Sequence, residues 1–372
     1  MSSHPLSPAS VPAIQNKPSH VTSLQQGLCA LTATEAVARL RAGDITSLDL
    51  VEASIARIEE VDSAVNALPI TCFNRARDMA RCWRLADCVE NPKSLCGLPI
   101  AVKDYNNVGA VRTTYGSPIF AQSVAAASDA TVRQLESNGA IPMAKSNVPE
   151  WAGGNTFNPV FGATRNPWDL RMSVGGSSGG SAAALASGSV WLATGNDLGG
   201  SLRTPAAFNG VVGLRPGPGR VPRGTRLPAM DTLWVEGPMA RCIDDLALMM
   251  DASVGYQADD PLSFDQSHVS FVAQLTAGDA PTRVAFSPDL GIVPMEPEVA
   301  QICGAAMRHF TGMGAEVTAD TPDFTGVLEA FQSLRAVLFA TLMAPILEQS
   351  RAQIAPEIIG NIERGLTIDP AQ

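Results

Sequence analysis

The chain has 372 residues, of which 45% are apolar and 17% charged, a composition typical of a compact globular enzyme rather than of a disordered or repeat protein. Its 36 acidic and 26 basic side chains give a formal net charge of −10. This charge disfavours nucleic acid and anionic membrane surfaces as partners and is better suited to small neutral substrates.

Residues 1–24 are rich in Ser, Pro and Gln and contain no apolar stretch of the kind found in signal peptides. No later run reaches the roughly 18 uninterrupted apolar residues of a membrane span. We therefore expect a flexible tail over 1–24, a single domain over 25–372 and a cytoplasmic location. The seven cysteines form no CxxC pair and only four histidines are present, which indicates reduced thiols and no metal site.

Helix and strand signals alternate along the chain. A capping box at Thr32–Glu35 predicts a helix to about Ala42, and apolar residues spaced by three and four predict a second helix around 48–58. The other predicted elements are strands over 67–73, 99–102, 140–144, 190–194, 211–214, 284–287 and 315–318, and helices over 74–89, 128–138, 181–187, from 204, and over 244–252, 298–310, 327–354 and 356–363. This alternation predicts an α/β fold with a mixed central β-sheet covered by helices on both faces, whose loops at strand ends carry the chemistry.

Lysine is rare among the basic residues. Only Lys17, Lys93, Lys103 and Lys145 are lysines, and the others are arginines. Arginine stays charged at any working pH, whereas a buried lysine can lose its proton. Lys103, at the end of the predicted strand 99–102, is therefore a candidate for titratable chemistry.

The loop at 175–181, Gly-Gly-Ser-Ser-Gly-Gly-Ser, leads into a predicted helix and could hold an anion or an oxyanion. It lacks the lysine of a phosphate-binding loop, and no GxGxxG fingerprint is present. Residues 176–180 formally match the nucleophile elbow GxSxG. That alternative makes Ser178 the nucleophile and requires His268 or His309 as its base.

The loop at 197–201, Asp-Leu-Gly-Gly-Ser, offers a second site. Two glycines let successive backbone N–H groups turn toward one point, as in an oxyanion hole. Ser201 is then a candidate nucleophile, and the predicted oxyanion donors are the N–H groups of Leu198, Gly199, Gly200 and Ser201. Taken alone, each glycine loop is also explained by a tight turn that requires glycine.

Together, the segments 97–104, 175–181 and 197–203 resemble the amidase signature family. Their order and the 24-residue step from Ser177 to Ser201 match that family, as do segments 145–150, 166–168 and 236–240. The resemblance covers roughly residues 25–370 and implies the amidase signature fold.

The resemblance implies a Ser–Ser–Lys triad without histidine. In it, Ser201 attacks the amide carbonyl, and Ser177, which follows a cis peptide bond, passes the proton to a neutral Lys103. Burial would lower the pKa of Lys103 enough for this role. Supporting roles fall to Ser178, Asp197 and Arg203, and a substrate wall to Ala152, Gly153, Gly154 and Asn155. No cofactor is implied.

Two features depart from the family pattern. Asn196 stands where the family commonly has a small hydroxyl residue or glycine. Members of the family also continue beyond the helices at 327–363, so we expect a C-terminally incomplete domain that lacks its last strand and helix.

The resulting interpretation is an amidase that cleaves small carboxamides to a carboxylate and ammonia or an amine, through an acyl-enzyme on Ser201. One alternative is the glutaminase (A) subunit of a tRNA-dependent amidotransferase, which uses the same triad within a complex. A second is an inactive, truncated relic or binding protein. A homodimer is left open, and neither nucleic acid nor a membrane is expected as a partner.

Overall fold

The structure is a computed structural model that describes residues 23–369, apart from 85, 87, 89, 90, 267, 269 and 279. The predicted tail over 1–24 lies outside the described residues except for its last two, which begin helix α1 (Ser23–Ala30). Helix α1 was not predicted from the sequence.

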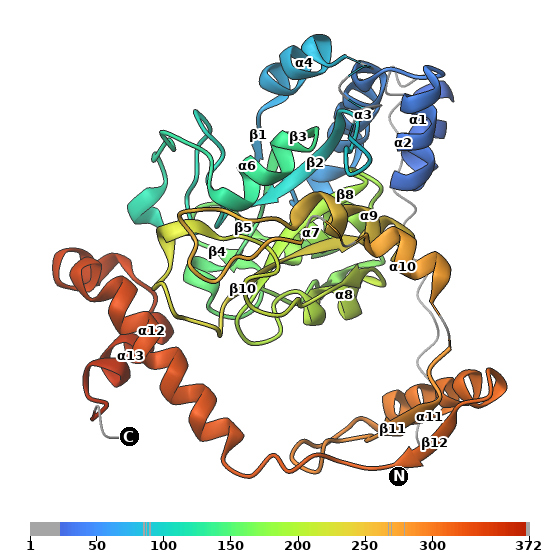
Figure 1. Ribbon diagram of the computed structural model, residues 1–372. Helices are drawn as coiled ribbons and strands as arrows, with labels where there is room; N and C mark the ends of the chain where they lie inside the picture. The colour runs from blue at the N-terminus through green and yellow to red at the C-terminus, as the bar shows by residue number, and fades with distance from the viewer. Residues whose placement is uncertain are drawn as a thin grey trace, which may run out of the picture.

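Six strands form one mixed sheet in the order β1-β3-β2-β8-β10-β9 (Figure 1). Strand β2 runs parallel to its neighbours β3 and β8, whereas β1, β10 and β9 join by antiparallel pairing. The strands are β1 (Ile70–Thr71), β2 (Leu98–Lys103), β3 (Ala140–Ser146), β8 (Leu192–Asp197), β9 (Val212–Gly213) and β10 (Val235–Ala240).

Helices cover both faces of this sheet, as predicted. Alternate side chains of β2 enter different cores, because successive residues of a strand point to opposite faces. Leu98, Ile100 and Val102 pack in one core and Ala101 in the other. The first core includes residues of α1, α2 (Ala33–Ala42), α6 (Ala130–Ser137) and α9 (Ile243–Ser253), and the second includes residues of α3 (Ser47–Val65), α4 (Phe73–Cys82), α7 (Gly179–Ala186) and α8 (Arg203–Asn209). Lys103, two residues beyond Ala101, belongs by this alternation to the second face.

The predicted start of α2 is confirmed. The Thr32 side chain accepts a hydrogen bond from Glu35 N, and the Glu35 carboxylate accepts one from Thr32 N at 2.8 Å. The helix ends at Gly43, whose φ of 78° lies in the left-handed region that glycine tolerates. Helix α3 begins with the same kind of capping box at Thr46 and Asp49.

Several predicted boundaries are wrong. The strand predicted over 67–73 is reduced to β1, because Asn66 ends α3 in a left-handed conformation and the Asp62 carboxylate accepts from Ala67 N and Leu68 N. The helix predicted over 74–89 ends at Cys82.

Several short elements were not predicted from the sequence. Strand β10 and helix α10 (Phe271–Ala277) are two of them. The others are the hairpins β4 (Phe157–Asn158) with β5 (Gly162–Ala163) and β6 (Arg165–Asn166) with β7 (Asp169–Ser173), and the 3₁₀ turns η1 (Pro118–Phe120), η2 (Glu150–Ala152), η3 (Gly224–Arg226) and η4 (Arg351–Gln353).

The C-terminal quarter contains two further groups of elements. Strands β11 (Arg283–Phe286) and β12 (Glu316–Ala319) pair in parallel with each other and lie with α11 (Pro297–Gly312) apart from the six-stranded sheet (Figure 1). Helices α12 (Val327–Ser350) and α13 (Pro356–Leu366) contribute to a third apolar core. The other buried residues of this core include Tyr105, Leu198 and Trp234.

Helix α12 also bears on the predicted absence of a membrane span. The segment Val327–Gln353 is long and apolar enough to cross a membrane by length and composition, although 33% of its most apolar window is buried within the protein. The search for uninterrupted apolar runs missed it because charged residues interrupt the helix. Buried core helices pass the same test, so this finding by itself assigns no membrane.

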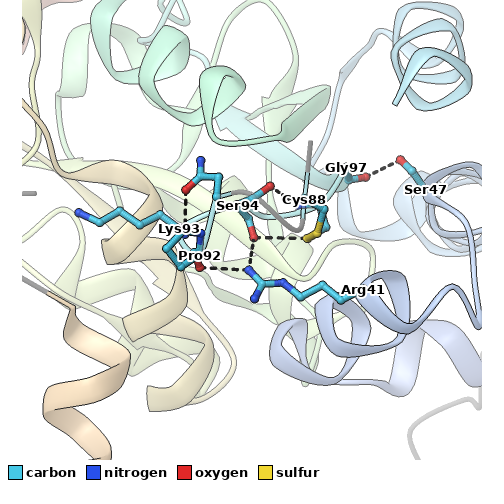
Figure 2. The surroundings of a disulfide bond; sticks show 9 residues. Arg41, Ser47, Cys88, Pro92, Lys93, Ser94 and Gly97 are labelled. Atoms are coloured by element: carbon cyan, nitrogen blue, oxygen red, sulfur yellow. Dashed lines mark hydrogen bonds between the residues drawn. A yellow bond between two sulfur atoms is a disulfide. The ribbon is translucent and has the colours of Figure 1, made fainter. Parts of the chain in front are cut away.

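A disulfide bond joins Cys88 to Cys96 just before β2, so the prediction that all cysteines are reduced is wrong for this pair. Figure 2 shows how the segment around it is held. Arg41 of α2 donates to the carbonyl oxygens of Pro92 and Ser94 at 3.0 and 3.3 Å. These contacts anchor the chain on α2 shortly before it enters the strand that ends at Lys103.

Candidate active site

Lys103 is the last residue of β2, and its side chain is fully buried. Its backbone N–H donates to Thr194 Oγ1 on the neighbouring strand β8 at 2.9 Å. Its Nζ lies 2.7 Å from Ser177 Oγ and 2.8 Å from Ser178 Oγ, and 5.0 Å from the centroid of the Tyr105 ring. The predicted base and the predicted proton relay are thus in direct hydrogen-bond contact.

The two serines come from the loop that precedes α7. The Gly176–Ser177 peptide bond is cis, as the resemblance implied. A Cβ atom at Gly176 would lie only 2.1 Å from Gly154 O, so only glycine fits there. The N–H of Ser178 donates to Ser201 O at 3.2 Å, which places the backbone of the predicted nucleophile beside this loop.

Asp197 organises the loop that carries Ser201. Its buried carboxylate accepts from Gly200 N at 2.7 Å and from Leu202 N at 3.1 Å, and Arg203 Nε lies 3.0 Å from it. Burial raises the pKa of Asp197, but the hydrogen bonds from Arg203 and the two N–H groups outweigh that effect and hold the pKa below its ordinary value. The predicted supporting roles of Asp197 and Arg203 fit this geometry.

One predicted oxyanion donor needs correction. The Gly200 N–H points to the Asp197 carboxylate, so it is not directed at a substrate oxygen in this structure. Gly200 is required here for a different reason, since its φ of 108° is one that other residues rarely adopt. The N–H groups of Leu198, Gly199 and Ser201 remain predicted donors.

Arg215, which was not predicted from the sequence, also binds Asp197 of this loop. Its guanidinium donates to Asp197 O and lies 3.3 Å from Asp197 Oδ1. It also donates to Leu233 O at 3.0 Å. Arg215 therefore connects the nucleophile loop to the segment that leads into β10.

Asn196 contacts Lys103, which was not predicted from the sequence. Its Oδ1 lies 2.6 Å from Lys103 Nζ, and its backbone oxygen lies 3.5 Å from the same nitrogen. The residue is 1% exposed. Asn196 is thus a direct partner of the predicted base.

A buried ion pair fixes the residue that follows Lys103. Lys145 Nζ lies 2.7 Å from Asp104 Oδ1 and 2.8 Å from Thr113 Oγ1, and Thr114 N donates to Asp104 Oδ2 at 3.1 Å. Burial lowers the pKa of Lys145, while the charge of Asp104 and its hydrogen bond oppose this shift. The pair ties β2 to β3 and to the loop that carries Tyr115.

An apolar cavity of about 260 Å³ lies next to these elements. Tyr115 and Trp151 stack with ring centroids 5.3 Å apart, and Phe120 meets Trp151 edge to face. The cavity is lined by Tyr105, Tyr115, Phe120, Trp151, Leu227, Trp234, Leu338, Phe339, Leu342, Met343 and Ile346. Leu198 of the nucleophile loop packs in the same apolar core as most of these residues, and Lys103 Nζ lies 5.0 Å from the ring of Tyr105 in the cavity wall.

The predicted substrate wall does not coincide with the lining of this cavity. Ala152, Gly153, Gly154 and Asn155 do not line it, whereas the preceding Trp151 does. The reason is local packing: Ala152 N donates to the Tyr105 hydroxyl, and a Cβ at Gly153 would meet Ile358 of α13.

The two walls of the cavity are connected by Glu150. Its carboxylate accepts from Ser117 Oγ at 2.7 Å and from Ala355 N, at the start of α13, at 3.0 Å. This one buried side chain therefore bridges the loop before Phe120 and the helical pair α12–α13.

The nucleophile-elbow alternative finds no support in this arrangement. Ser178 Oγ contacts Lys103 and Asn196 O rather than a histidine. His309 lies on α11, beside the separate strands β11 and β12, and His268 lies in the segment between α9 and α10. Within the part of the chain that the structure describes, no cluster of three or more potential metal ligands occurs.

Comparison with known proteins places the chain in a family. Residues 49–364 match the family model described as Amidase, so the chain belongs to the Amidase family. It is 37% identical over 315 residues to an acylamidase of Rhodococcus erythropolis, an alignment that covers 83% of this chain and 65% of the relative. It is 34% identical to the A subunit of the glutamyl-tRNA(Gln) amidotransferase of Chromohalobacter salexigens, over 77% of this chain and 59% of the relative. The chain therefore spans less than two thirds of the length of these curated relatives.

Solved structures agree with the fold. A bacterial aryl acylamidase superposes with a TM-score of 0.83 at 28% identity, covering 91% of this chain and 73% of that structure. A 6-aminohexanoate cyclic dimer hydrolase superposes with a TM-score of 0.83 at 26% identity, covering 92% of this chain and 73% of that structure. Both the family and the predicted α/β fold are confirmed.

Proposed function

We propose that the protein hydrolyses the C–N bond of carboxamides through an acyl-enzyme on Ser201, with Ser177 and Lys103 moving the proton. The observation that carries this proposal is the 2.7 Å contact between Lys103 Nζ and Ser177 Oγ at a fully buried position. An arginine at position 103 could not act as a base, because its guanidinium does not lose a proton in proteins.

The proposed reaction proceeds in two halves. Ser201 Oγ forms a bond to the carbonyl carbon while its proton passes to Ser177 Oγ, whose own proton passes to Lys103 Nζ. The carbonyl electrons move onto the oxygen, which the backbone N–H groups of Leu198, Gly199 and Ser201 stabilise. The C–N bond then breaks, and the proton returns through Ser177 to the leaving nitrogen. Water cleaves the acyl-enzyme by the same relay and regenerates Ser201.

The cavity supports an apolar acyl group as the preferred substrate part. Its wall is built from aromatic and aliphatic side chains, and apolar pockets with few polar groups favour ligands of the same character. The similarity to an acylamidase and to an aryl acylamidase structure points in the same direction. We therefore propose apolar acyl amides and anilides as the substrate class.

A fluorophosphonate probe tests the nucleophile and its base. We expect labelling of Ser201 in the wild-type chain, its loss in Ser201→Ala and Lys103→Met, and severe slowing in Ser177→Ala. Lys93→Met is the matched control, because the Lys93 amine donates to the carbonyl of Gln266 at 3.4 Å and takes no part in the proposed relay. Circular dichroism confirms that each variant is folded. Labelling at Ser178 would support the elbow instead, and a folded chain that neither labels nor hydrolyses amides would support the inactive relic.

The glutaminase (A) subunit of a tRNA-dependent amidotransferase is the second candidate, because relatives of that description are 33% to 36% identical to this chain. A glutaminase would have to accept a polar side chain, which the apolar cavity disfavours. Ammonia release from glutamine that appears only when partner subunits and charged tRNA are added would decide for this candidate.

A further inference from the structure

We propose that Asn196 is a positioning residue whose amide oxygen orients the amine of Lys103 so that its lone pair faces Ser177. The proposal rests on the proposed function, in which a neutral Lys103 receives the proton of Ser177. Asn196 Oδ1 lies 2.6 Å from Lys103 Nζ, as close as the two serine oxygens at 2.7 and 2.8 Å.

The roles of these three oxygens differ. A neutral amine has two N–H groups and one lone pair. An amide oxygen only accepts hydrogen bonds, so one of the two protons is directed at Asn196, whose Oδ1 lies 2.6 Å and whose backbone oxygen lies 3.5 Å from Lys103 Nζ. Ser178 Oγ lies 3.4 Å from Asn196 O and donates to it, so its own oxygen is available to accept the second proton. The lone pair is left for Ser177, whose hydroxyl then donates to Lys103.

Residue 196 supplies this acceptor from the neighbouring strand β8. An apolar side chain of similar size would offer the amine no acceptor and would leave no room for a water molecule in its place. Asn196 is held on β8, directly opposite Glu236 of β10 in the antiparallel register. The Tyr105 ring lies 5.0 Å from Lys103 Nζ. Among the charged groups on the adjoining elements, Asp104 follows Lys103 and is paired with Lys145, Asp197 follows Asn196 and is bound to two arginines, and Glu236 lies opposite Asn196 on β10.

The first test is the pH dependence of kcat and kcat/KM in Asn196→Leu and Asn196→Asp. In Asn196→Leu, whose side chain has similar size but no acceptor, we expect kcat to fall by about tenfold or more with KM nearly unchanged, because the proton relay loses its orientation. An aspartate oxygen also only accepts, so Asn196→Asp should keep a near wild-type plateau at high pH. Its negative charge should shift the acidic limb upward by about 1 pH unit or more. Asn138→Ser is the matched control, because Asn138 follows α6 at the far end of β2, where its carbonyl accepts from Leu95 N.

The second test reads the amine directly and needs no turnover. The chain has only four lysines, so lysine labelled with ¹³C at Cε gives a simple NMR spectrum, in which Lys103→Met assigns the Lys103 signal. The titration midpoint of that signal should rise by about 1 pH unit or more in Asn196→Asp and fall in Asn196→Ala, but stay unchanged in Asn138→Ser.

The two tests separate failure of this proposal from failure of the proposed function. An active enzyme whose Asn196→Leu variant keeps the wild-type kcat would overturn the orienting role. A Lys103 signal that does not respond to Asn196→Asp or Asn196→Ala would overturn the contact, even if the wild-type chain proved inactive. Absence of amide hydrolysis together with a responsive Lys103 signal would refute the proposed reaction but support the contact between Asn196 and Lys103.

Discussion

The apolar cavity predicts a steep dependence of turnover on the length of the acyl group. Its volume of about 260 Å³ is bounded by aromatic rings on one side and by α12 on the other. Each methylene moved from water onto such a surface contributes about 0.8 kcal/mol, or about fourfold in kcat/KM. Replacing acetyl by hexanoyl in a p-nitroanilide adds four methylenes and should raise kcat/KM about 200-fold, measured by release of p-nitroaniline.

Two neighbouring residues of α12 provide the matched pair of variants for this prediction. Leu342 lines the cavity, whereas Thr341 is exposed. Leu342→Gln should flatten the increase with chain length, because an amide at the wall must be desolvated by the acyl chain. Thr341→Gln should leave it unchanged. An active enzyme with no increase from acetyl to hexanoyl, or the same slope in both variants, would refute the assignment of the cavity to the acyl group.

Two further predictions concern buried charges. Lys145→Met leaves the Asp104 carboxylate unpaired and should reduce the free energy of unfolding, measured in urea, by about 3–5 kcal/mol. Adding Asp104→Leu should recover most of this loss, and a loss below about 1 kcal/mol in Lys145→Met would contradict the prediction. Asp197 has a pKa below its ordinary value of 3.8 in the folded state, so its stabilising contribution is complete above that value and is lost as the pH falls through the folded pKa. Urea titrations between about pH 2.5 and pH 5 should therefore show a stability loss that is smaller in Asp197→Asn, and identical slopes in the two proteins would argue against the contribution.

Local sequence signals predicted the elements that depend on local physics. The capping box at Thr32 and the apolar spacing of α3 depend only on residues within a few turns, and both were found in place. Strand β2 was predicted from its apolar run, and the structure extends it to include Lys103 itself. The contact between Lys103 and Ser177 could be anticipated only through the resemblance to a family, because the two residues are 74 positions apart.

Strand β10 shows why some elements could not be predicted. Gly237 and Pro238 are both disfavoured in strands, and nothing in the local pattern offsets them. Pairing with β8 does so in the fold, where Pro238 lies opposite Thr194 and Gly237 opposite Gly195. This pairing joins two segments that are distant in the sequence, which periodicity does not detect.

The cavity was missed for a related reason. Its wall draws on four separate parts of the chain, around residues 105–120, 151, 227–234 and 338–346. The sequence reasoning favoured the small residues 152–155 because glycines leave space, but space next to a loop is often filled by a distant side chain. The sequence marked Asn196 only as an unusual residue for its position in the family. Its amide oxygen, which only accepts hydrogen bonds, was the signal that could have identified it as a partner of Lys103.

Glu150 has a consequence for selectivity that reaches beyond its own contacts. Because one carboxylate is bound by both Ser117 and Ala355, the residue just before α13, separating the aromatic wall from the α12–α13 pair would break a buried charged hydrogen bond. A residue outside the lining therefore helps to hold the width of the cavity. Under the proposed function, acyl groups would be sorted by thickness as well as by length, and Glu150 would contribute to that limit from outside the lining.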